Sequence, residues 1–428
     1  MTGNAYAQTE MKSNFNWKLV VEIIGGILFV MLVAWFFFFR STPELTPTET
    51  PQQTGSFNSQ TSVGANSVVG STNANEAIPS PVSQQKVFKI SDGPIAGATF
   101  MQELRPTTTI ARFVKQENGH VLDLAIDSPG SVARASSNTT IPGVARVAWE
   151  LQQDAGRTRA AGATMQYIEG STIKTVLLNF PLASTTSSTP APVRIQFLPN
   201  DIIDIVASPD GRSLAYLLAA PGGVDGYVAR ADGTNTTRLF SLPLSQVLLS
   251  WPTQSTLMVT SKAATGLAGI AFSVNATTGA TAPILYAPGL TTTADSFFSQ
   301  VVYQSATENA RTTYTHDTKT NLDRPLSFDP IPEKCAWSRT QVSVMYCAVS
   351  LSYLPTNYID LLHQGTGSSI DSIVVFNLAT GLTAILANPG GAEGGEASDI
   401  TNLTISQDDK YLLFIKKGER SLWGVRLY

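Results

Sequence analysis

The stretch Ile202–Phe240, which reads IIDIVASPDGRSLAYLLAAPGGVDGYVARADGTNTTRLF, contains two tight-turn motifs between apolar segments. Ser208-Pro209-Asp210-Gly211 has its residues in the order that a type I turn prefers, and Asp232-Gly233 favours a second tight hairpin. The apolar segments flank these turns at residues 202–207, 213–219, 227–230 and 236–240. The stretch therefore predicts a four-stranded antiparallel meander.

The same arrangement recurs along the chain. Turns between the first and second strands of a unit, here called first-hairpin turns, are predicted at Ser250–Thr253, Ser338–Gln341 and Ser406–Asp409. Turns between the third and fourth strands, here called third-hairpin turns, are predicted at Asp127–Gly130, Asn275–Gly279, Asp317–Asn321 and Asn377–Gly381. Asp232, Asn275 and Asp317 follow one another at about 43 and about 42 residues, within the range of about 40–45 that is typical of a propeller blade. With weaker units around Ala96–Arg134 and Val144–Leu198, residues 86–428 predict an all-β fold, a β-propeller of about seven four-stranded blades. Six or eight blades, a solenoid or paired sandwiches are the alternatives.

The two ends of this region complement each other. The last unit has strands only at Asn402–Ser406, Lys410–Lys416 and Ser421–Leu427, before the chain ends at Tyr428. Val87–Ile90 is an isolated apolar segment that can supply the missing fourth strand. Pairing strands from both ends removes an open sheet edge, so we expect the N-terminal strand to close the ring.

The repeat resembles the Ser-Pro-Asp-Gly family of bacterial propellers, and is similar to the repeat domain of periplasmic TolB-like proteins and to WD-like, membrane-anchored propellers. The resemblance covers about residues 86–428, and Ser208–Gly211 is its best copy. It implies a scaffold that binds proteins or peptides, although function has to be argued from a site.

The composition narrows the function further. The 428 residues include 28 Lys+Arg and 32 Asp+Glu, for a net charge of −4, and 14% of residues are charged against about 25% in a typical soluble protein. This balance excludes an electrostatic nucleic-acid binder, which needs a basic face. Hydrophobic residues make up 43% and aromatic residues 9% of the chain, enough for a large core.

Residues 17–40 predict a transmembrane helix. The apolar run Trp17–Phe39 spans about 34 Å as a helix, which exceeds a hydrocarbon core of about 30 Å. A cleaved signal peptide is the main alternative, but Phe36–Arg40 offers no small residues for cleavage. A pilin-like leader is a further alternative.

Residues 41–85 predict a disordered tether, because Ser, Thr, Pro, Gln and Asn dominate the segment and bury little apolar surface. Lys12 and Lys18 precede the predicted helix, whereas Arg40 alone follows it closely. This bias and the stalk-like tether predict a single-pass protein of the cell membrane. Residues 1–16 then form a cytoplasmic tail, and the propeller at 86–428 is external.

No motif for catalysis, metal binding or a cofactor is apparent. His120, His316 and His363 fall in three different blades without the spacing of metal ligands, and no G-x-S-x-G elbow or phosphate-binding loop occurs. Glu393, Glu396 and Asp399 lie on a glycine-rich stretch at 390–399 that does not match an EF-hand, so we interpret it as a solvated loop. We therefore expect a protein without cofactor that is not an enzyme.

Cys335 and Cys347 lie on the two strands that flank the turn Ser338–Gln341, at similar distances from it. Opposed residues of an antiparallel pair bring their Cα atoms to about 4.5–5.5 Å, which a disulfide can bridge. An oxidising exterior allows this bond. The alternative is a pair of buried thiols on neighbouring strands.

The largest insertion in a blade, Leu354–Asp371, lies between the second and third strands of blade 6 and on the face away from the tether's attachment. Its candidate partner-binding residues are Tyr358, Ile359, Asp360, Leu361, Leu362 and His363, which combine apolar area with a few polar groups. The alternative is a loop packed on the protein itself. Trp149, Trp251, Trp337 and Trp423 lie at strand ends, where core packing explains them better than a ligand platform.

These features predict a membrane-anchored, extracytoplasmic propeller that serves as a protein-interaction platform for an envelope or surface protein or peptide. The alternatives are an envelope enzyme that acts on surface glycans or peptides, and a small-solute binder in the propeller axis. Carboxylates converging on the channel favour the enzyme, whereas an exposed apolar surface favours the platform.

Overall fold

The computed structural model describes residues 85–104, 107–137, 139–154, 156–180, 193–390 and 398–428. The predicted transmembrane helix at 17–40 lies outside the described residues, as do the predicted tether up to residue 84 and Glu393 and Glu396 of the glycine-rich stretch. Among the described residues, no helix has the length and apolar character that crossing a membrane requires.

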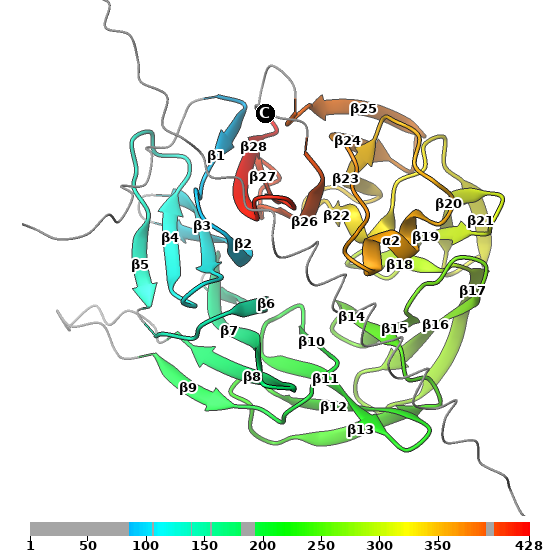
Figure 1. The fold of residues 1–428 in the computed structure, drawn as a ribbon, viewed down its shortest axis with the longest axis horizontal. Helices are drawn as coiled ribbons and strands as arrows, with labels where there is room; N and C mark the ends of the chain where they lie inside the picture. Colours follow the sequence, from blue (N-terminus) through cyan, green and yellow to red (C-terminus); the bar gives the residue numbers. More distant parts are fainter. Residues whose placement is uncertain (1–84, 105–106, 138, 155, 181–192, 391–397) are drawn as a thin grey trace, which may run out of the picture. The chain divides into compact units, whose positions relative to one another are not determined.

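The described strands form seven four-stranded antiparallel sheets, here called blades 1 to 7 in chain order, arranged around a common axis (Figure 1). Blade 1 comprises β2 (Ile95–Leu104), β3 (Thr107–Lys115), β4 (Val121–Ala125) and β5 (Arg134–Ser137). Blade 2 comprises β6 (Val144–Asp154), β7 (Arg157–Glu169), β8 (Thr172–Asn179) and β9 (Arg194–Phe197). Blade 3 comprises β10 (Asp204–Ala207), β11 (Ser213–Ala220), β12 (Gly223–Arg230) and β13 (Thr237–Leu242).

The remaining blades follow the same order from the axis outward. Blade 4 comprises β14 (Val247–Thr253), β15 (Thr256–Ser261), β16 (Ala268–Asn275) and β17 (Thr281–Pro288). Blade 5 comprises β18 (Thr291–Ala294), β19 (Gln300–Ala306), β20 (Arg311–Asp317) and β21 (Leu322–Pro325). Blade 6 comprises β22 (Cys335–Trp337), β23 (Val344–Ser350), β24 (Asp371–Asn377) and β25 (Leu382–Ala387). The 3-10 helix η1 (Pro332–Lys334) precedes blade 6, and α2 (Tyr358–His363) lies between β23 and β24.

Blade 7 contains strands from both ends of the described chain. β26 (Ile400–Ile405), β27 (Tyr411–Lys416) and β28 (Ser421–Arg426) are completed on the outside by β1 (Val87–Lys89). β1 pairs antiparallel with β28 in the register Val87↔Val425, Phe88↔Gly424 and Lys89↔Trp423. The structure thus confirms a seven-bladed propeller and the predicted closure by an N-terminal strand.

Each junction between neighbouring blades has an apolar core of its own. One cluster joins Leu257 and Val259 of blade 4 to Ala215 and Leu217 of blade 3, and the other junctions are built in the same way. At the point of closure, Phe88 and Leu413 of blade 7 pack in one cluster with Phe113 of blade 1. Both faces of every blade are therefore buried, as close packing of a ring requires.

One predicted turn is wrong. Ser250–Thr253 lies inside β14, and the hairpin between β14 and β15 is formed where Thr253 pairs with Thr256. The register shifts between Ser250 and Thr253, so the strand accommodates Pro252 at an irregularity instead of ending there. The other predicted first-hairpin and third-hairpin turns connect the strands as expected.

Two faces of the ring follow from this connectivity. First-hairpin and third-hairpin turns lie on one face, here called the turn face. Second hairpins and blade-to-blade connections lie on the other, here called the connection face. β1 starts beside the end of β28, because the Arg426 amide donates to the Lys86 carbonyl over 2.9 Å. The described chain therefore begins at the turn face, whereas the blade 6 insertion lies on the connection face, as predicted.

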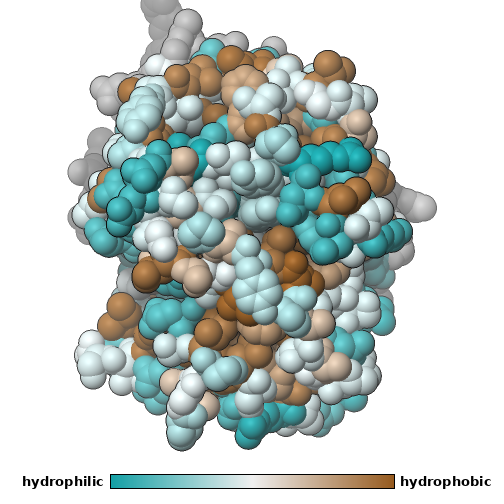
Figure 2. All heavy atoms as spheres, turned by 90° about the vertical axis from the view of Figure 1, so that its right-hand side faces the viewer, coloured by the Kyte–Doolittle hydropathy of each residue, from teal (hydrophilic) through white to brown (hydrophobic). Residues whose placement is uncertain are grey.

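The outer strands carry exposed apolar side chains that include Tyr286 on β17, Leu322 on β21 and Leu382 on β25, which are 69%, 56% and 70% exposed. Viewed from the side that is at the right in Figure 1, apolar residues lie between polar ones and gather in the lower half (Figure 2). Exposed apolar residues of this kind are ordinary on a protein surface when they occur singly.

We predict that Phe88→Ala lowers the free energy of unfolding by about 3–5 kcal/mol. The Phe88 side chain is 1% exposed and its ring lies so close to Gly424 that a Cβ there would be 2.5 Å from Cζ. Chemical denaturation measures the change, and deleting residues 86–91 should have a larger effect. Lys89→Ala is the control, because Lys89 is exposed and its side chain contacts Asp92 at 3.1 Å and the Trp423 ring at 5.9 Å on the surface. Equal stability of the Phe88 variant and the wild type would contradict closure by β1.

Candidate functional site

The candidate site is the axial channel of the ring. A cavity of about 460 Å³ is bordered by first strands of six blades, with lining residues that include Leu151, Ala207, Trp251, Thr293, Ala336 and Leu403. A cavity surrounded by so many first strands lies on the axis. Its remaining walls include the turn residues Ser208 and Ser338, so it opens at the turn face.

A second cavity, of about 610 Å³, lies toward the connection face. Its walls come from the start of β2, β6 and β26 and from the hairpin between β27 and β28. Trp149 and Thr404 line both cavities, which are therefore adjacent along the axis. Volumes of this size are in the range of small-molecule sites, about 300–1,000 Å³.

Basic residues supply the charge of the connection-face cavity. Arg146, Lys417 and Arg420 line it, and no Asp or Glu is among the described residues that line either axial cavity. Arg146 pairs with Asp204, and Lys417 lies 3.5 Å from Asp399. Both carboxylates are buried behind the wall, with side chains 3% and 6% exposed. The channel wall therefore exposes cations, whereas the carboxylates that pair with two of them are buried behind the wall.

Arg420 differs from the other two cations. Its Nη2 atom donates to the Ile95 carbonyl oxygen over 3.3 Å, and its buried Nε atom has no hydrogen-bond partner within the described chain. No ion pair of Arg420 is present in the described ranges. Its backbone has a φ of 54°, a conformation that is uncommon for a residue other than glycine. The structure thus holds an uncompensated guanidinium at this end of the channel.

Three tryptophans line the cavity that opens at the turn face. Trp149, Trp251 and Trp337 are half-buried, and each packs against the apolar core between two blades while it lines the channel. Trp337 Nε1 donates to Thr293 Oγ1 over 3.2 Å, whereas Nε1 of Trp149 and of Trp251 has no partner within the described residues. The indoles therefore combine the core role favoured by the sequence with a place in the channel wall.

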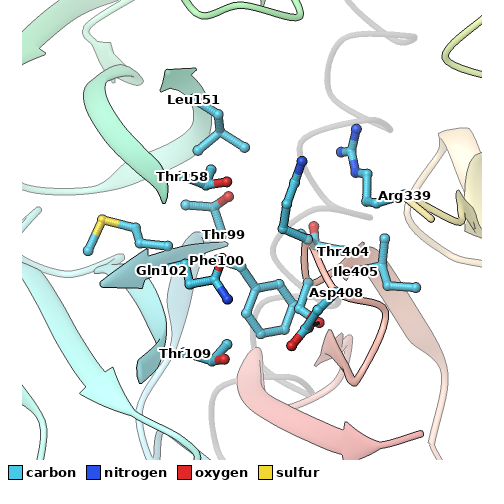
Figure 3. A pocket seen from close by; sticks show the side chains of 13 residues that line it. Thr99, Phe100, Gln102, Thr109, Leu151, Thr158, Arg339, Thr404, Ile405 and Asp408 are labelled. Carbon is cyan, nitrogen blue, oxygen red and sulfur yellow. Dashed lines mark hydrogen bonds between the residues drawn. The ribbon is translucent and has the colours of Figure 1, made fainter. Parts of the chain in front are cut away.

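A smaller pocket lies at the turn face between blades 1, 2 and 7. Its volume is about 20 Å³, which holds about one water molecule. Arg339 and Leu151 lie on opposite sides of it (Figure 3). Asp409 accepts the backbone N–H of Arg339 over 2.8 Å and the Ser338 hydroxyl over 2.5 Å, which fixes this turn of blade 6 on blade 7.

Cys335 and Cys347 face each other across β22 and β23 and are joined by a disulfide with an S–S distance of 2.07 Å. Their Cα atoms lie 4.1 Å apart. Cys335 also lines the cavity of about 460 Å³. The bond links the innermost strand of blade 6 to the next strand.

We predict that the purified full-length chain contains no reactive thiol until it is reduced. Alkylation without reduction should leave the intact mass unchanged, whereas alkylation after reduction should label both cysteines, the only two in the chain. Labelling of the folded, unreduced protein would contradict the disulfide.

The six predicted partner-binding residues form α2, which packs against neighbouring blades. Tyr358 and Ile359 are each 1% exposed and lie in a cluster with Ala263, Ala306 and Ile331. Asp360, Leu361, Leu362 and His363 are half-buried. That α2 itself binds a partner stays a prediction, but its most apolar side chains are occupied within the chain, as in the alternative of a self-packed loop.

Polar contacts hold α2 at both ends. Asp360 Oδ1 accepts the Thr265 amide of blade 4 over 2.9 Å. His363 binds the Ala263 carbonyl oxygen and Glu333 at 3.2 Å and 2.9 Å. Burial opposes ionisation of His363, but Glu333 outweighs this effect and raises the pKa of the imidazole. α2 therefore ties blade 6 to the loops of blade 4.

A buried lysine connects the insertion to blade 7. Lys334 Nζ, with a side chain 3% exposed, donates to Ser369 Oγ and Asp371 Oδ2 at 2.8 Å each and to Asp399 Oδ1 at 2.5 Å. Burial by itself lowers the pKa of Lys334, but the two carboxylates outweigh it, so that the pKa is raised. Asp399, which the sequence placed on a solvated loop, is thus a buried partner of cations.

The other predicted polar residues have local roles. His316 Nδ1 lies 2.9 Å from Asp323, and His120 Nε2 lies 3.5 Å from Thr140 Oγ1. No group of His, Cys, Asp and Glu within the described residues is arranged to hold a metal ion. Trp423 is paired with Lys89 on β1 and lies under Lys416 Nζ at 3.9 Å, away from the channel lining.

Glu150 is a buried carboxyl that the sequence analysis did not identify. It is 1% exposed and follows Trp149 on β6; Oε1 accepts the Thr164 hydroxyl over 3.2 Å, while Oε2 has no hydrogen-bond partner in the described part of the chain. Burial raises the pKa of Glu150 to about 8, against a smaller lowering by Thr164. The group is therefore a neutral acid near pH 7.

We predict that Glu150 makes the folded state less stable as pH rises. Its folded pKa of about 8 lies above the ordinary value of 4.5, so stability present below pH 4.5 is lost progressively as pH rises toward 8. Relative to Glu150→Gln, the wild type should lose about 4 kcal/mol of unfolding free energy across this range. Denaturation at pH 5 and pH 8.5 measures it, with the exposed Glu169→Gln as control. Parallel pH profiles of the wild type and Glu150→Gln would show that the carboxyl is not buried as described.

Comparisons with known proteins find similarity only among solved structures, at low sequence identity. No family model and no curated protein matches the chain. An oligogalacturonate lyase in complex with manganese shares 13% identity at a TM-score of 0.48, over 79% of this chain and 99% of that chain. The Cps50 (Swd1) β-propeller domain of Myceliophteria thermophila shares 8% identity at a TM-score of 0.49, over 80% of this chain and 100% of that chain. TolB from Acinetobacter baumannii shares 10% identity at a TM-score of 0.38, over 79% of this chain and 65% of that chain.

Proposed function

We propose that this protein is a membrane-anchored, extracytoplasmic propeller that binds a protein or peptide of the cell envelope on its connection face and is not an enzyme. The observation that carries the proposal is a set of exposed apolar side chains on loops that the insertion holds in place. The location rests on the sequence of residues 17–85, which predicts a membrane span and an external tether.

The insertion joins the connection-face loops of three blades. Besides the contacts of α2 with blade 4, Arg311 Nη1 donates to the Pro355 carbonyl oxygen over 3.1 Å. Thr356 Oγ1 donates to the Glu308 carbonyl oxygen over 2.8 Å. These bonds fix the insertion on blade 5 as well. Loops held in one arrangement lose less conformational entropy on binding, so they are suited to a specific contact.

Large apolar side chains project from these loops. Tyr353 is 86% exposed, Leu267 66%, Ile370 58% and Leu351 54%. Leu267 lies on the loop between β15 and β16 of blade 4, and the other three flank α2 in blade 6. Aromatic and aliphatic residues on a fixed surface are the groups that supply most binding energy in protein interfaces.

The direction of the chain supports this choice of face. The described residues begin at the turn face, beside the end of β28. The predicted tether would therefore join the propeller on the face opposite the insertion. Among the described residues, the polar side chains that line the axial cavities are cations, indoles, hydroxyls and the Asn402 amide. Hydrolysis by general acid–base catalysis commonly uses positioned carboxylates or histidines.

We predict that a photo-crosslinking amino acid at position 353 captures a protein in intact cells, whereas the same group at position 297 does not. Phe297 is the matched control because it is 67% exposed but lies on the turn between β18 and β19. A second variant, Leu351→Ser with Ile370→Ser, should lower capture at position 353 by at least about tenfold, since it removes apolar contact area. Equal capture at both positions, or capture that the double variant leaves unchanged, would argue against the connection face as the interface.

A further inference from the structure

The axial channel combines features that a partner platform does not need. Its two adjacent cavities, of about 610 and 460 Å³, meet at Trp149 and Thr404. Together they connect a basic region near the connection face with an aromatic region near the turn face. This arrangement depends on the ring itself, because the walls come from blades that are far apart in sequence.

The charge in the basic region is available to a ligand. Asp204 accepts hydrogen bonds from the Leu249 amide over 2.7 Å and from its neighbour Ile205 over 2.8 Å, in addition to its pair with Arg146. The carboxylate is thus engaged on both oxygens within the wall, whereas the Arg146 side chain is 45% exposed. An arginine has five N–H donors, and Arg146 uses Nη1 for Asp204, so it retains donors that Asp204 does not engage.

Arg420 adds a charge that the described wall does not neutralise. Within the described wall, the Arg420 guanidinium donates a hydrogen bond to the carbonyl oxygen of Ile95, the first residue of β2, and this acceptor is neutral. The Ile95 amide in turn donates to the Arg420 carbonyl oxygen over 3.0 Å. Both the backbone and the side chain of Arg420 in blade 7 are therefore bonded to Ile95 in blade 1. A positioned guanidinium of this kind suits a planar carboxylate or a sulfate.

The neighbouring wall suits a ring. Trp149 lines the same cavity as Arg146 and Arg420. Toward the turn face, the hydroxyl residues Ser250 and Thr292 accompany Trp251 and Trp337. Indoles attract flat apolar surfaces, and hydroxyls bind polar substituents, so the wall matches a molecule with a ring and one anionic group better than a simple inorganic ion.

We propose that the axial channel is a binding site for a small organic anion that carries a ring, with its anionic group at Arg420 and Arg146 and its ring against Trp149. This site is separate from the proposed partner surface and does not rest on it. Two sources share this chemistry, an aromatic carboxylate and an acidic sugar, and they differ in the hydroxyls that the ring presents.

Titration calorimetry of the full-length chain in detergent tests the proposal with benzoate and glucuronate, each beside its neutral counterpart, benzamide or glucose. At least one of the two anions should bind, at least about tenfold more tightly than its counterpart, and more weakly as salt is raised. Benzoate alone would identify an aromatic carboxylate, and glucuronate or both would identify an acidic sugar as an accepted ligand. Binding of neither anion at millimolar concentration, or equal binding of neutral and anionic forms, would overturn the proposal.

Variants separate this site from nonspecific binding. Arg420→Gln should weaken binding of the anion at least about tenfold, and Arg420→Lys should weaken it less because it keeps the charge. Trp149→Phe should weaken binding and reduce the change in fluorescence on titration. Arg194→Gln on the outer strand β9 is the control and should have no effect, since Arg194 is exposed and lies outside the channel. Thermal melting shows that each variant is folded, and unchanged affinity of a folded Arg420→Gln would contradict the site.

Discussion

Burial of both faces of every blade is the constraint on which the rest of the structure depends. A four-stranded sheet with two apolar faces needs a neighbour on each side, and only a closed ring gives every sheet two neighbours. Phe88 shows how this closure is achieved. It pairs with Gly424 in blade 7 and packs in the core that blade 7 shares with blade 1. A strand of three residues thereby completes a ring of more than three hundred.

The channel depends on closure, and the insertion depends on the side-by-side arrangement of consecutive blades. Because the closed ring brings blades 7, 1 and 2 together, Arg146 on the first strand of blade 2 and Arg420 in the β27–β28 hairpin of blade 7 line one cavity. Most of the propeller separates these two residues in sequence. The insertion uses the same circular arrangement at the connection face, where Asp360 of blade 6 accepts the Thr265 amide of blade 4 across blade 5. A ring with an open seam would not hold Arg146 and Arg420 at one cavity.

The sequence was most informative where structure is local. Ser208 Oγ accepts the Ser213 amide over 3.0 Å and Asn275 Oδ1 accepts the Thr278 amide over 2.8 Å, and these turn contacts are encoded by residues three to five apart. Repeated turns therefore predicted the blades, and the unpaired ends predicted the closing strand. The turn at Ser250–Thr253 was wrong because proline is also compatible with an irregular strand, and a single sequence does not distinguish the two.

Most of the candidate site could not be predicted from the sequence, because it depends on contacts between residues that are far apart in the chain. Nothing in the local sequence of Arg146 or Arg420 indicates which way either side chain points once the ring has closed. Tyr358 and Ile359 looked like contact residues because they are apolar on a loop, but blades 4 and 5 supply the surface that buries them. The exposed Tyr353, five residues earlier, could be recognised only once that packing was known.

Hydrogen–deuterium exchange at the seam of the ring tests the central claim most directly. The Ile90 amide donates to Leu422 over 2.8 Å and the Arg426 amide to Lys86 over 2.9 Å. Amides that open only by global unfolding exchange together. The closed ring predicts that the bonded amides of residues 86–90 and 421–426 exchange as slowly as those of β27 in blade 7. Exchange of residues 86–90 at the rate of an unstructured chain, with β27 still protected, would show that β1 does not close the propeller.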